Sequence, residues 1–467
     1  MPLCASAVVT LLLCSSCADA GDAGDSGDSG TPAPLPFVWF EELAVARGLD
    51  FQHRSGHASA FWMPEIMGGG AALFDADGDG DLDAYLVQSG RLEEGAEPRS
   101  ANALFENTGA GWFRPVSAVP PNPGYGMGVA SGDADEDGDP DLYATNFGPN
   151  ALFENRGGLR FSDAGERSGT AHRGWNTSAA FFDAERDGDL DLFVVNYLDW
   201  SFAGELPCLN ALSQPDYCSP KNYRSPARSV LLVNRGAGRF TDASESSGIA
   251  GRRGNGLGVA VGDVDGDGWL DVFVANDGTA NHLWRNRGAL VFEEIGMRAG
   301  CGVDTSGQEK AGMGVVLADL DRDLDLDVLV CNLAGESDSL FLNEKGYFVD
   351  RTALSGIAAV SRPFTRFGVG LFDLDHDGEL DLFEANGRVQ SATLPEREDV
   401  YAEENLVFRG VGPARFAELP LRGGVREPLV ATGRAAAFGD VDGDGAIDVT
   451  QEFERDGTPV AEPVSPL

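Results

Sequence analysis

Short apolar or alternating runs, separated by turns rich in glycine and aspartate, recur along the whole chain. Runs such as LDAYLV at 82–87 and LDVFVA at 270–275 follow an acidic loop, and a further run such as ALFENTG at 103–109 comes next. A fourth often follows, as at 239–242. Runs of this length and composition are typical of strands. The chain is therefore predicted to be all-β, with about four strands in each repeat.

The run before each acidic loop is built from small residues. Examples are Gly and Ala at 68–72, 126–130, 256–260 and 312–316. Glycine in a strand is expected where another backbone approaches closely. Four strands per unit, with the small residues on the first strand, predict a radial β-propeller.

One acidic pattern, Asp-x-[Asp/Glu]-x-Asp-x-x-x-Asp, occurs seven times in the chain, at intervals that give a unit of about fifty residues with two insertions. The starts of the seven copies predict seven blades, each with its acidic loop between the first two strands. The acidic positions are Asp75, Asp77, Asp79 and Asp83; Asp133, Asp135, Asp137 and Asp141; Asp183, Glu185, Asp187 and Asp191; Asp263, Asp265, Asp267 and Asp271; Asp319, Asp321, Asp323 and Asp327; Asp373, Asp375, Asp377 and Asp381; and Asp440, Asp442, Asp444 and Asp448.

Clustered carboxylates at positions one, three, five and nine of a tight loop suit Ca²⁺, which takes six to eight oxygen ligands. The sequence therefore predicts up to seven calcium ions. Position six is glycine in all loops but the fifth, where Leu324 predicts a distorted or weaker site. The loops are not EF-hands, because strands rather than helices flank them. A structural role is favoured over a catalytic metal, since no open coordination position is evident.

The repeats resemble FG-GAP (VCBS) calcium-binding propeller repeats, and residues 37–453 are similar to the cartilage acidic protein family. The strings FQHRSG, MPEIMGGGAALFDADGDGDLD and DYCSPKNYRSPARSVLLVNRGAGRF carry this resemblance. It implies a secreted or envelope-attached propeller of seven blades and says little about activity. Bacterial members of this family usually carry an ASPIC/UnbV module at the carboxyl end, and the sequence, which ends at Leu467, departs from that pattern because it lacks this module.

The last repeat is too short for four strands of its own. The segment FVWFEEL at 37–43 is expected to complete the seventh blade by pairing the two ends of the chain. The alternative is a truncated final blade. The propeller domain is accordingly predicted to span 37–467.

Residues 1–20 are interpreted as a signal peptide, because the apolar run at 5–14 has the length of a signal-peptide core. Two kinds of processing remain open. Cleavage would follow the small residues at 18–20, whereas a degenerate lipobox would make Cys17 a lipid anchor. Residues 21–36 predict a flexible Gly/Asp/Ser linker, and no run reaches transmembrane length. The expected location is secreted or attached to the cell envelope.

Charge narrows the choice of partners. With 75 acidic and 34 basic residues the chain carries a formal charge of −41, which repels nucleic acid. The predicted partner is an extracellular protein or a glycan.

The remaining candidate residues leave alternatives open. Cys208 and Cys218 are expected to form a disulfide, and Cys301 and Cys331 either pair or remain buried thiols. His53 and His57 with Glu65 suggest a metal or acid–base site, although structural roles are favoured. Four tryptophans serve either core packing or sugar stacking: Trp175, Trp200, Trp269 and Trp284.

Two functions follow from these observations. The first is a non-catalytic binding, adhesion or scaffold module stabilised by calcium. The second is a carbohydrate-active enzyme such as a polysaccharide lyase, which needs convergent basic and tyrosine side chains. The one locally basic stretch, 199–229, is where such a site is expected, and it contains Tyr217, Lys221, Tyr223, Arg224 and Arg228.

Overall fold

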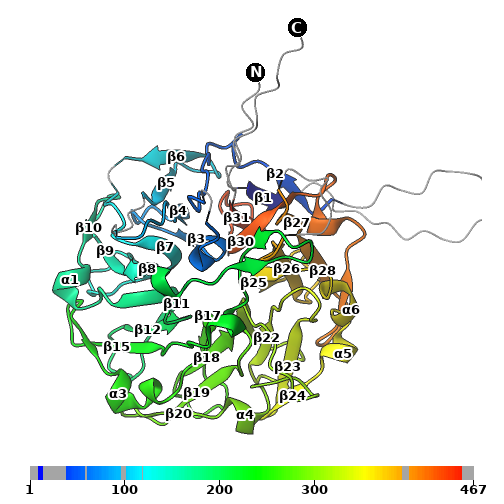
Figure 1. Cartoon of the computed structure of the whole chain (residues 1–467). Helices are drawn as coiled ribbons and strands as arrows, with labels where there is room; N and C mark the ends of the chain where they lie inside the picture. The colour runs from blue at the N-terminus through cyan, green and yellow to red at the C-terminus, as the bar shows by residue number, and fades with distance from the viewer. Residues whose placement is uncertain are drawn as a thin grey trace, which may run out of the picture.

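Small antiparallel sheets follow one another around a ring in the computed structural model, which describes residues 9–13, 38–57, 60–95, 101–117, 119–391 and 399–454 (Figure 1). This arrangement confirms the predicted all-β propeller. The count of seven blades stays a prediction. Cys17 and the linker at 21–36 lie outside the described residues.

Four sheets contain four strands each, paired in chain order. They are β3 (Gly70–Phe74), β4 (Asp83–Val87), β5 (Ala103–Asn107) and β6 (Phe113–Val116); β17 (Gly256–Gly262), β18 (Asp271–Asn276), β19 (His282–Asn286) and β20 (Phe292–Glu294); β21 (Val315–Ala318), β22 (Asp327–Val330), β23 (Ser339–Asn343) and β24 (Phe348–Asp350); and β25 (Arg366–Phe372), β26 (Asp381–Asn386), β28 (Leu406–Gly410) and β29 (Phe416–Glu418).

Two further units are joined into one larger sheet, because β8 pairs with β11 as well as with its own neighbours. Their strands are β7 (Tyr125–Gly132), β8 (Asp141–Pro149), β9 (Ala151–Asn155) and β10 (Phe161–Asp163), followed by β11 (Arg173–Phe182), β12 (Asp191–Asn196), β15 (Val230–Asn234) and β16 (Phe240–Asp242).

The two ends of the chain meet in the last sheet, whose order is β2-β1-β31-β30-β27 (Figure 1). Its strands are β2 (Phe40–Glu42), β1 (Val9–Leu13), β31 (Asp448–Glu454), β30 (Val430–Gly439) and β27 (Glu403–Glu404). The segment at 37–43 therefore reaches the expected sheet, but it does not pair with β31 directly. The apolar strand β1, which the sequence assigned to a signal peptide, lies between them.

Helices are short and lie in the connections. They are α1 (Gly165–Ser168), α2 (Pro220–Tyr223), α3 (Ser244–Ser247), α4 (Gly296–Ala299), α5 (Thr352–Ser355) and α6 (Ala358–Ser361), with 3-10 turns at η1 (Met63–Ile66), η2 (Phe202–Gly204), η3 (Ile249–Gly251) and η4 (Arg422–Gly424). A two-stranded hairpin of β13 (Cys208–Leu209) and β14 (Pro215–Asp216) completes the elements. In the described part of the chain no helix has the length and apolarity to cross a bilayer.

The small residues of the first strands lie where neighbouring units touch, as predicted. A Cβ atom on Gly258 would lie 2.2 Å from the carbonyl oxygen of Met313, and one on Gly314 would lie 1.9 Å from that of Phe367. No real Cβ tolerates such contacts. The glycines therefore let the inner strands converge.

Asparagine side chains link neighbouring units. The asparagine that ends each third strand donates from Nδ2 to the carbonyl of the second residue in the acidic loop of the preceding unit, over 2.7–2.9 Å. The pairs are Asn107 to Val441, Asn155 to Ala76, Asn234 to Ala134, Asn286 to Ala184, and Asn343 to Val264. The first of them joins the beginning of the ring to its end. Where Gly410 replaces the asparagine, the backbone N–H of Ala414 donates to Leu320 instead.

We expect Asn155→Ala to lower the free energy of unfolding by about 1–3 kcal/mol, because it leaves the buried carbonyl of Ala76 without its donor. Chemical denaturation would measure the loss. Gln308→Ala, at an exposed position, is the control and should change stability by less than about 0.5 kcal/mol. Equal effects of the two substitutions would contradict a role for the asparagine as a link.

Candidate metal sites

The seven acidic loops connect the first and second strands of successive units, so they share one face of the ring, here called the loop face. In every loop the aspartate at position one closes the turn, since its Oδ1 accepts the N–H of position five and its Oδ2 that of position six. These bonds measure 2.8–3.2 Å. The loops are thus preformed by their own carboxylates.

Two positions of each loop require left-handed backbone. Position six has a φ between 75° and 100° in all seven loops, with Leu324 at 75°. The fifth loop is therefore not distorted, since Leu324 keeps its hydrogen bond to Asp319 and its side chain is 90% exposed. Its cost is local strain of about 1 kcal/mol. Position four is also left-handed, although it is Glu136, Arg186, Arg322 or His376 in four loops, and sequence reasoning missed this requirement.

The aspartate at position nine is buried in every loop and holds the loop to its own sheet. Its Oδ2 accepts the N–H of position two over 2.8–3.1 Å. In six units its Oδ1 accepts an N–H from the third strand over 2.7–2.8 Å. This residue is as much a structural anchor as a candidate ligand.

Burial raises the pKa of these position-nine carboxyls, against the hydrogen bonds that lower it, and neighbouring carboxylates raise it further. The pKa is about 6 for Asp83, Asp327 and Asp381, and about 7 for Asp141, Asp191, Asp271 and Asp448. A nearby cation would favour the charged form of each group.

The carboxylates converge as a cation site requires. In the first, second and fourth loops oxygens of positions one, three and nine lie within 4.8 Å of one another, and in the fifth loop those of Asp319, Asp321 and Asp323 do. The position-three residues Asp77, Asp135, Asp321 and Asp375 each carry a buried Oδ1 with no hydrogen-bond partner. Buried acceptors without donors, surrounded by other carboxylates, fit a hard cation such as Ca²⁺.

Arginines offset part of this charge. Arg409 contacts Asp375 at 2.8 Å and Asp377 at 2.7 Å, and Arg285 pairs with Asp265. Arg156 lies 3.6 Å from Asp135, and Arg235 lies 3.4 Å from Glu185. The loops therefore differ in how much negative charge is left for a cation to neutralise.

The opposite face, here called the cap face, is crossed by the insertion at 199–229. Tyr401 and Ser391 both donate to the carboxylate of Asp216, at 2.9 Å and 2.7 Å, so the insertion from the third unit is bonded to the sixth. Trp200 and Met63 both donate to Glu205, which fixes the start of the insertion above the ring.

His57 and Glu65 meet under this insertion, with His57 Nδ1 2.8 Å from Glu65 Oε2. The hydroxyl of Tyr217 lies 3.2 Å from the same nitrogen and 3.3 Å from the same oxygen. His53 lies apart, fully buried with Nε2 2.9 Å from the hydroxyl of Ser89. Burial, aided by the charge of Arg434, lowers the pKa of His53 to about 3.

The basic side chains of the insertion do not converge, contrary to the expectation for a lyase site. Arg228 pairs with Glu245 at the surface, and Tyr223 donates to Glu205 at 2.5 Å. Lys221 packs over Gly278. These side chains therefore end in three separate places: at the surface of the third unit, within the insertion, and over the fourth unit.

Cysteines and tryptophans are also placed. Cys208 and Cys218 form a disulfide within the insertion, whereas Cys301 and Cys331 are separate buried thiols, so their pairing is excluded. Trp175, Trp200 and Trp284 are buried, which suits packing rather than sugar stacking. Trp269 is stacked by the guanidinium of Arg186 at 5.0 Å.

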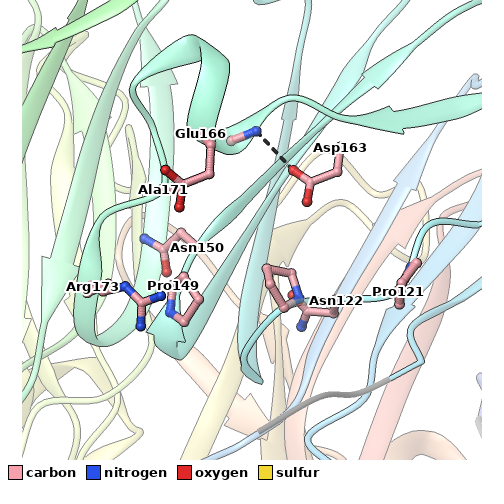
Figure 2. A pocket seen from close by; sticks show the side chains of 10 residues that line it. Pro121, Asn122, Pro149, Asn150, Asp163, Glu166, Ala171 and Arg173 are labelled. Atoms are coloured by element: carbon pink, nitrogen blue, oxygen red, sulfur yellow. Dashed lines mark hydrogen bonds between the residues drawn. The ribbon is translucent and has the colours of Figure 1, made fainter. Parts of the chain in front are cut away.

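A pocket of 430 Å³ opens on the cap face beside the second unit (Figure 2). Pro149 and Asn150 form one side, at the end of β8 away from the acidic loop, and Arg173 and Glu166 bring charges of both signs. Asp163 is held in place because its Oδ1 accepts the N–H of Gly165 at 2.9 Å. A second pocket of 290 Å³ adjoins Arg173 and His172.

The FG-GAP-like repeat family matches residues 75–144, 133–194, 214–274, 263–330 and 319–384, which together make up more than half of the chain. Among curated proteins, cartilage acidic protein 1 of Xenopus tropicalis is 26% identical over 439 residues, covering 86% of this chain and 59% of that protein. The human protein of the same name is 29% identical over 237 residues, covering 50% of this chain and 33% of its own length. The chain thus spans at most about three fifths of these relatives.

Among solved structures, an Agrocybe aegerita lectin that recognises terminal N-acetylglucosamine aligns with a TM-score of 0.43 at 17% identity, over 78% of this chain and 80% of the lectin. This likeness is too distant to bear on function.

In metal-free protein we expect the melting temperature to rise by several degrees as the pH falls from 8.5 to 6.5. Position-nine carboxyls with a folded pKa of about 6–7 bind protons more tightly than the unfolded chain does, so their contribution is present at low pH and is lost as the pH rises through that range.

Thermal melting in chelator would check this dependence on pH. The window ends at 6.5 because the folded pKa values of His53 and His282, lowered to about 3 and about 4, act in the opposite sense below it. If the melting temperature instead falls as the pH is lowered from 8.5 to 6.5, these carboxyls stay ionised in the folded protein.

Proposed function

Because the chain belongs to the FG-GAP-like repeat family, we propose that it is an extracytoplasmic propeller that calcium stabilises and that binds a protein or glycan without catalysis. The seven predicted blades would carry up to seven ions on the loop face, leaving the cap face to partners. The observation that supports this division most directly is the set of buried, unpartnered Oδ1 atoms at position three of the acidic loops.

Electrostatics supports a structural role for the metal. Two carboxylates about 5 Å apart repel by about 0.8 kcal/mol even at the dielectric constant of water, and each loop contains several such pairs. At millimolar calcium and a dissociation constant near 10⁻⁴ M, each occupied site adds about 1.4 kcal/mol of stability. The proposed ions thus convert a repulsive ring of loops into a stabilising one.

Export is part of the proposal. Signal-peptide cleavage after residue 20 or lipidation at Cys17 would each remove β1, which leaves β2 as the strand available to pair with β31. The mass of the mature amino terminus distinguishes the two. The similarity to cartilage acidic proteins supports an extracellular location without assigning a partner.

A second candidate function is a carbohydrate-active enzyme such as a polysaccharide lyase. One observation favours it: the contacts among His57, Glu65 and Tyr217 place a base, a carboxylate and a phenol together. Such a group is able to move a proton. Against it, Lys221 and Arg228 of the insertion do not gather there in the part of the chain that the structure describes.

Calcium binding can be tested within one loop. We expect Asp135→Ala to lower the calcium stoichiometry measured by calorimetry by one and to lower the melting temperature in calcium, since it removes a ligand at position three. Asp139→Ala is the matched control, because position seven of such loops binds calcium through its main-chain carbonyl. Loss of one ion in both variants, or in neither, would count against the assigned ligands.

The two functions are separable by experiment. A glycan array run beside a turnover screen on uronate polymers should show retention without product if the chain is a binding module. Product formation that His57→Gln abolishes would favour the enzyme instead. Arg160→Ala changes an exposed residue away from His57, Glu65 and Tyr217 and is the control for folding.

A further inference from the structure

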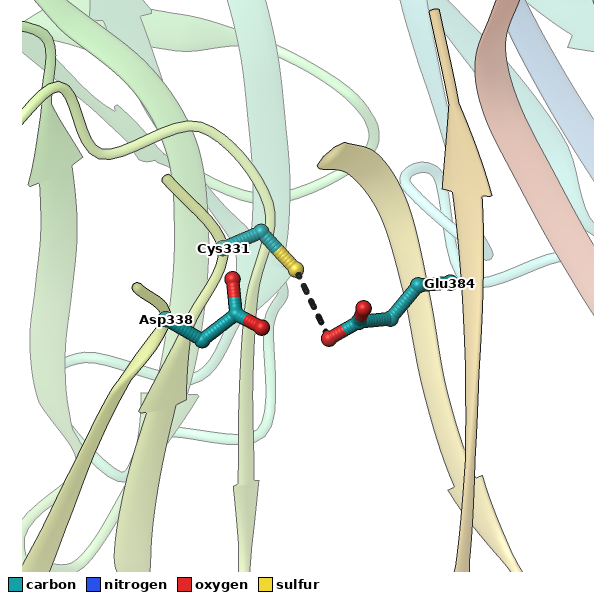
Figure 3. A group of neighbouring side chains, drawn as sticks. All are labelled: Cys331, Asp338 and Glu384. Atoms are coloured by element: carbon teal, nitrogen blue, oxygen red, sulfur yellow. Dashed lines mark hydrogen bonds between the residues drawn. The ribbon is translucent and has the colours of Figure 1, made fainter. Parts of the chain in front are cut away.

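A buried cluster of Cys331, Asp338 and Glu384 lies between two neighbouring sheets (Figure 3). Cys331 follows β22 and Asp338 precedes β23 in one sheet, whereas Glu384 is on β26 of the next. All three side chains are within 1% of full burial. One ligand atom from each lies within 4.8 Å of the others, and Cys331 Sγ is 4.0 Å from Glu384 Oε1.

With both carboxyls ionised, the cluster has one negative charge too many, and burial beside Asp338 raises the pKa of Glu384 well above its usual value. Arg366, also fully buried, donates from Nε to Asp338 Oδ1 at 2.6 Å, and its other nitrogens donate to the carbonyls of Ser361 and Glu336. Arg366 and Asp338 thus balance each other, and Glu384 has no cation of its own. A buried carboxylate without compensation is strongly unfavourable.

Two oxygens of the cluster also lack donors. Asp338 Oδ2 and Glu384 Oε2 are buried and have no hydrogen-bond partner. In Figure 3 both carboxylates and the thiol of Cys331 point toward the same small space between the sheets. The lack of donors is a separate observation from the kinds of residue in the cluster. It indicates that a group with positive charge belongs between these acceptors.

We propose that a thiophilic divalent cation such as Zn²⁺ binds at this point, held by Cys331 Sγ, Asp338 Oδ2 and the carboxylate of Glu384. A thiolate, two carboxylates, one guanidinium and a dication sum to zero charge. The donor set is wrong for Ca²⁺, which takes oxygen ligands, and right for zinc. The site is therefore chemically distinct from the acidic loops and does not depend on the proposed function.

The geometry requires only a small adjustment. Bonds of about 2.3 Å to sulfur and about 2.0 Å to oxygen place tetrahedral ligands about 3.3–3.8 Å apart. In the structure the three ligand atoms lie within 4.8 Å of one another, so binding would need them to approach by at most about 1.5 Å. The bound ion would join β26 to the neighbouring sheet, in the manner of a structural cross-link.

The repeat itself shows that these residues are unusual. Cys331 precedes the asparagine that follows its second strand, Asn332, as Ala275 and Ala385 precede theirs. Glu384 stands two residues before Asn386, where five other units have apolar residues such as Val274 and Val330 and the last unit has the buried Gln451. Cys331→Ala therefore places a residue that two sister units already tolerate.

The test uses the full chain in millimolar calcium, which keeps the acidic loops occupied, with Zn²⁺ or Co²⁺ as the probe. We expect about one equivalent of zinc to remain after dialysis, and cobalt to give a near-ultraviolet charge-transfer band from thiolate to metal. Cys331→Ala should lose both signals. Cys301→Ala, which removes the other buried thiol, should keep both.

Glu384→Gln separates the cation from a proton shared between Glu384 and Asp338. With a metal, this variant should bind zinc at least tenfold more weakly and should lose the zinc-dependent rise in melting temperature. If a proton occupies the site, the Glu384→Gln variant should be at least as stable as the wild-type chain, and zinc should have no effect on either. That result would show the proposal to be wrong. Absence of the cobalt band in the wild-type chain, or its persistence in Cys331→Ala, would overturn it equally.

Discussion

The fold depends on the aspartate at position nine of each acidic loop. This residue accepts the N–H of position two in its own loop, and the carbonyl of position two accepts the asparagine of the next unit. A single residue, at position two, therefore joins the loop, its own sheet and the neighbouring sheet. Because each of these hydrogen bonds is buried, removing one side chain leaves its donor or acceptor partner without another hydrogen bond. The ring is held by this repeated connection as well as by apolar packing between sheets.

The same constraint explains why the chain is so acidic. An anchor that accepts two backbone donors must be a carboxylate or a similar acceptor, and its burial raises its pKa. Further carboxylates at positions one and three then increase the repulsion in the same loop. Arginines such as Arg409 reduce it in some loops, whereas a cation would reduce it in all. Acidity on the loop face is thus a structural requirement, whereas the acidic residues of the cap face, such as Asp216 and Glu205, hold the insertion in place.

Much of this organisation could be predicted from the sequence, because it repeats. The acidic pattern, the strand after it and the small residues before it each recur, so chance is excluded and the propeller follows. The link made by Asn155 and its counterparts was not predicted, although Asn-x-Gly recurs at 107–109, 155–157, 234–236 and 286–288, because the partner of each asparagine lies in another unit. The left-handed backbone at Arg186 was missed because only some loops have glycine there. Contacts across the ring, such as that of Tyr217 with His57, leave no pattern in a single sequence.

Departures from the repeat fall into two kinds. Some are compensated by the structure: Gly410 lacks the linking side chain, yet Ala414 supplies a backbone donor, and Leu324 keeps the loop path at the cost of local strain. Cys331 and Glu384 are of the other kind, because they bring a thiol and a carboxylate to positions that several sister units, though not the last, fill with apolar side chains. Nothing among the described residues donates a hydrogen bond to Glu384 Oε2 or to Oδ2 of the neighbouring Asp338. Because several sister units have apolar residues at these two positions, the fold does not require a polar pair there. That reasoning singles out this interface over the compensated positions as a place for a ligand.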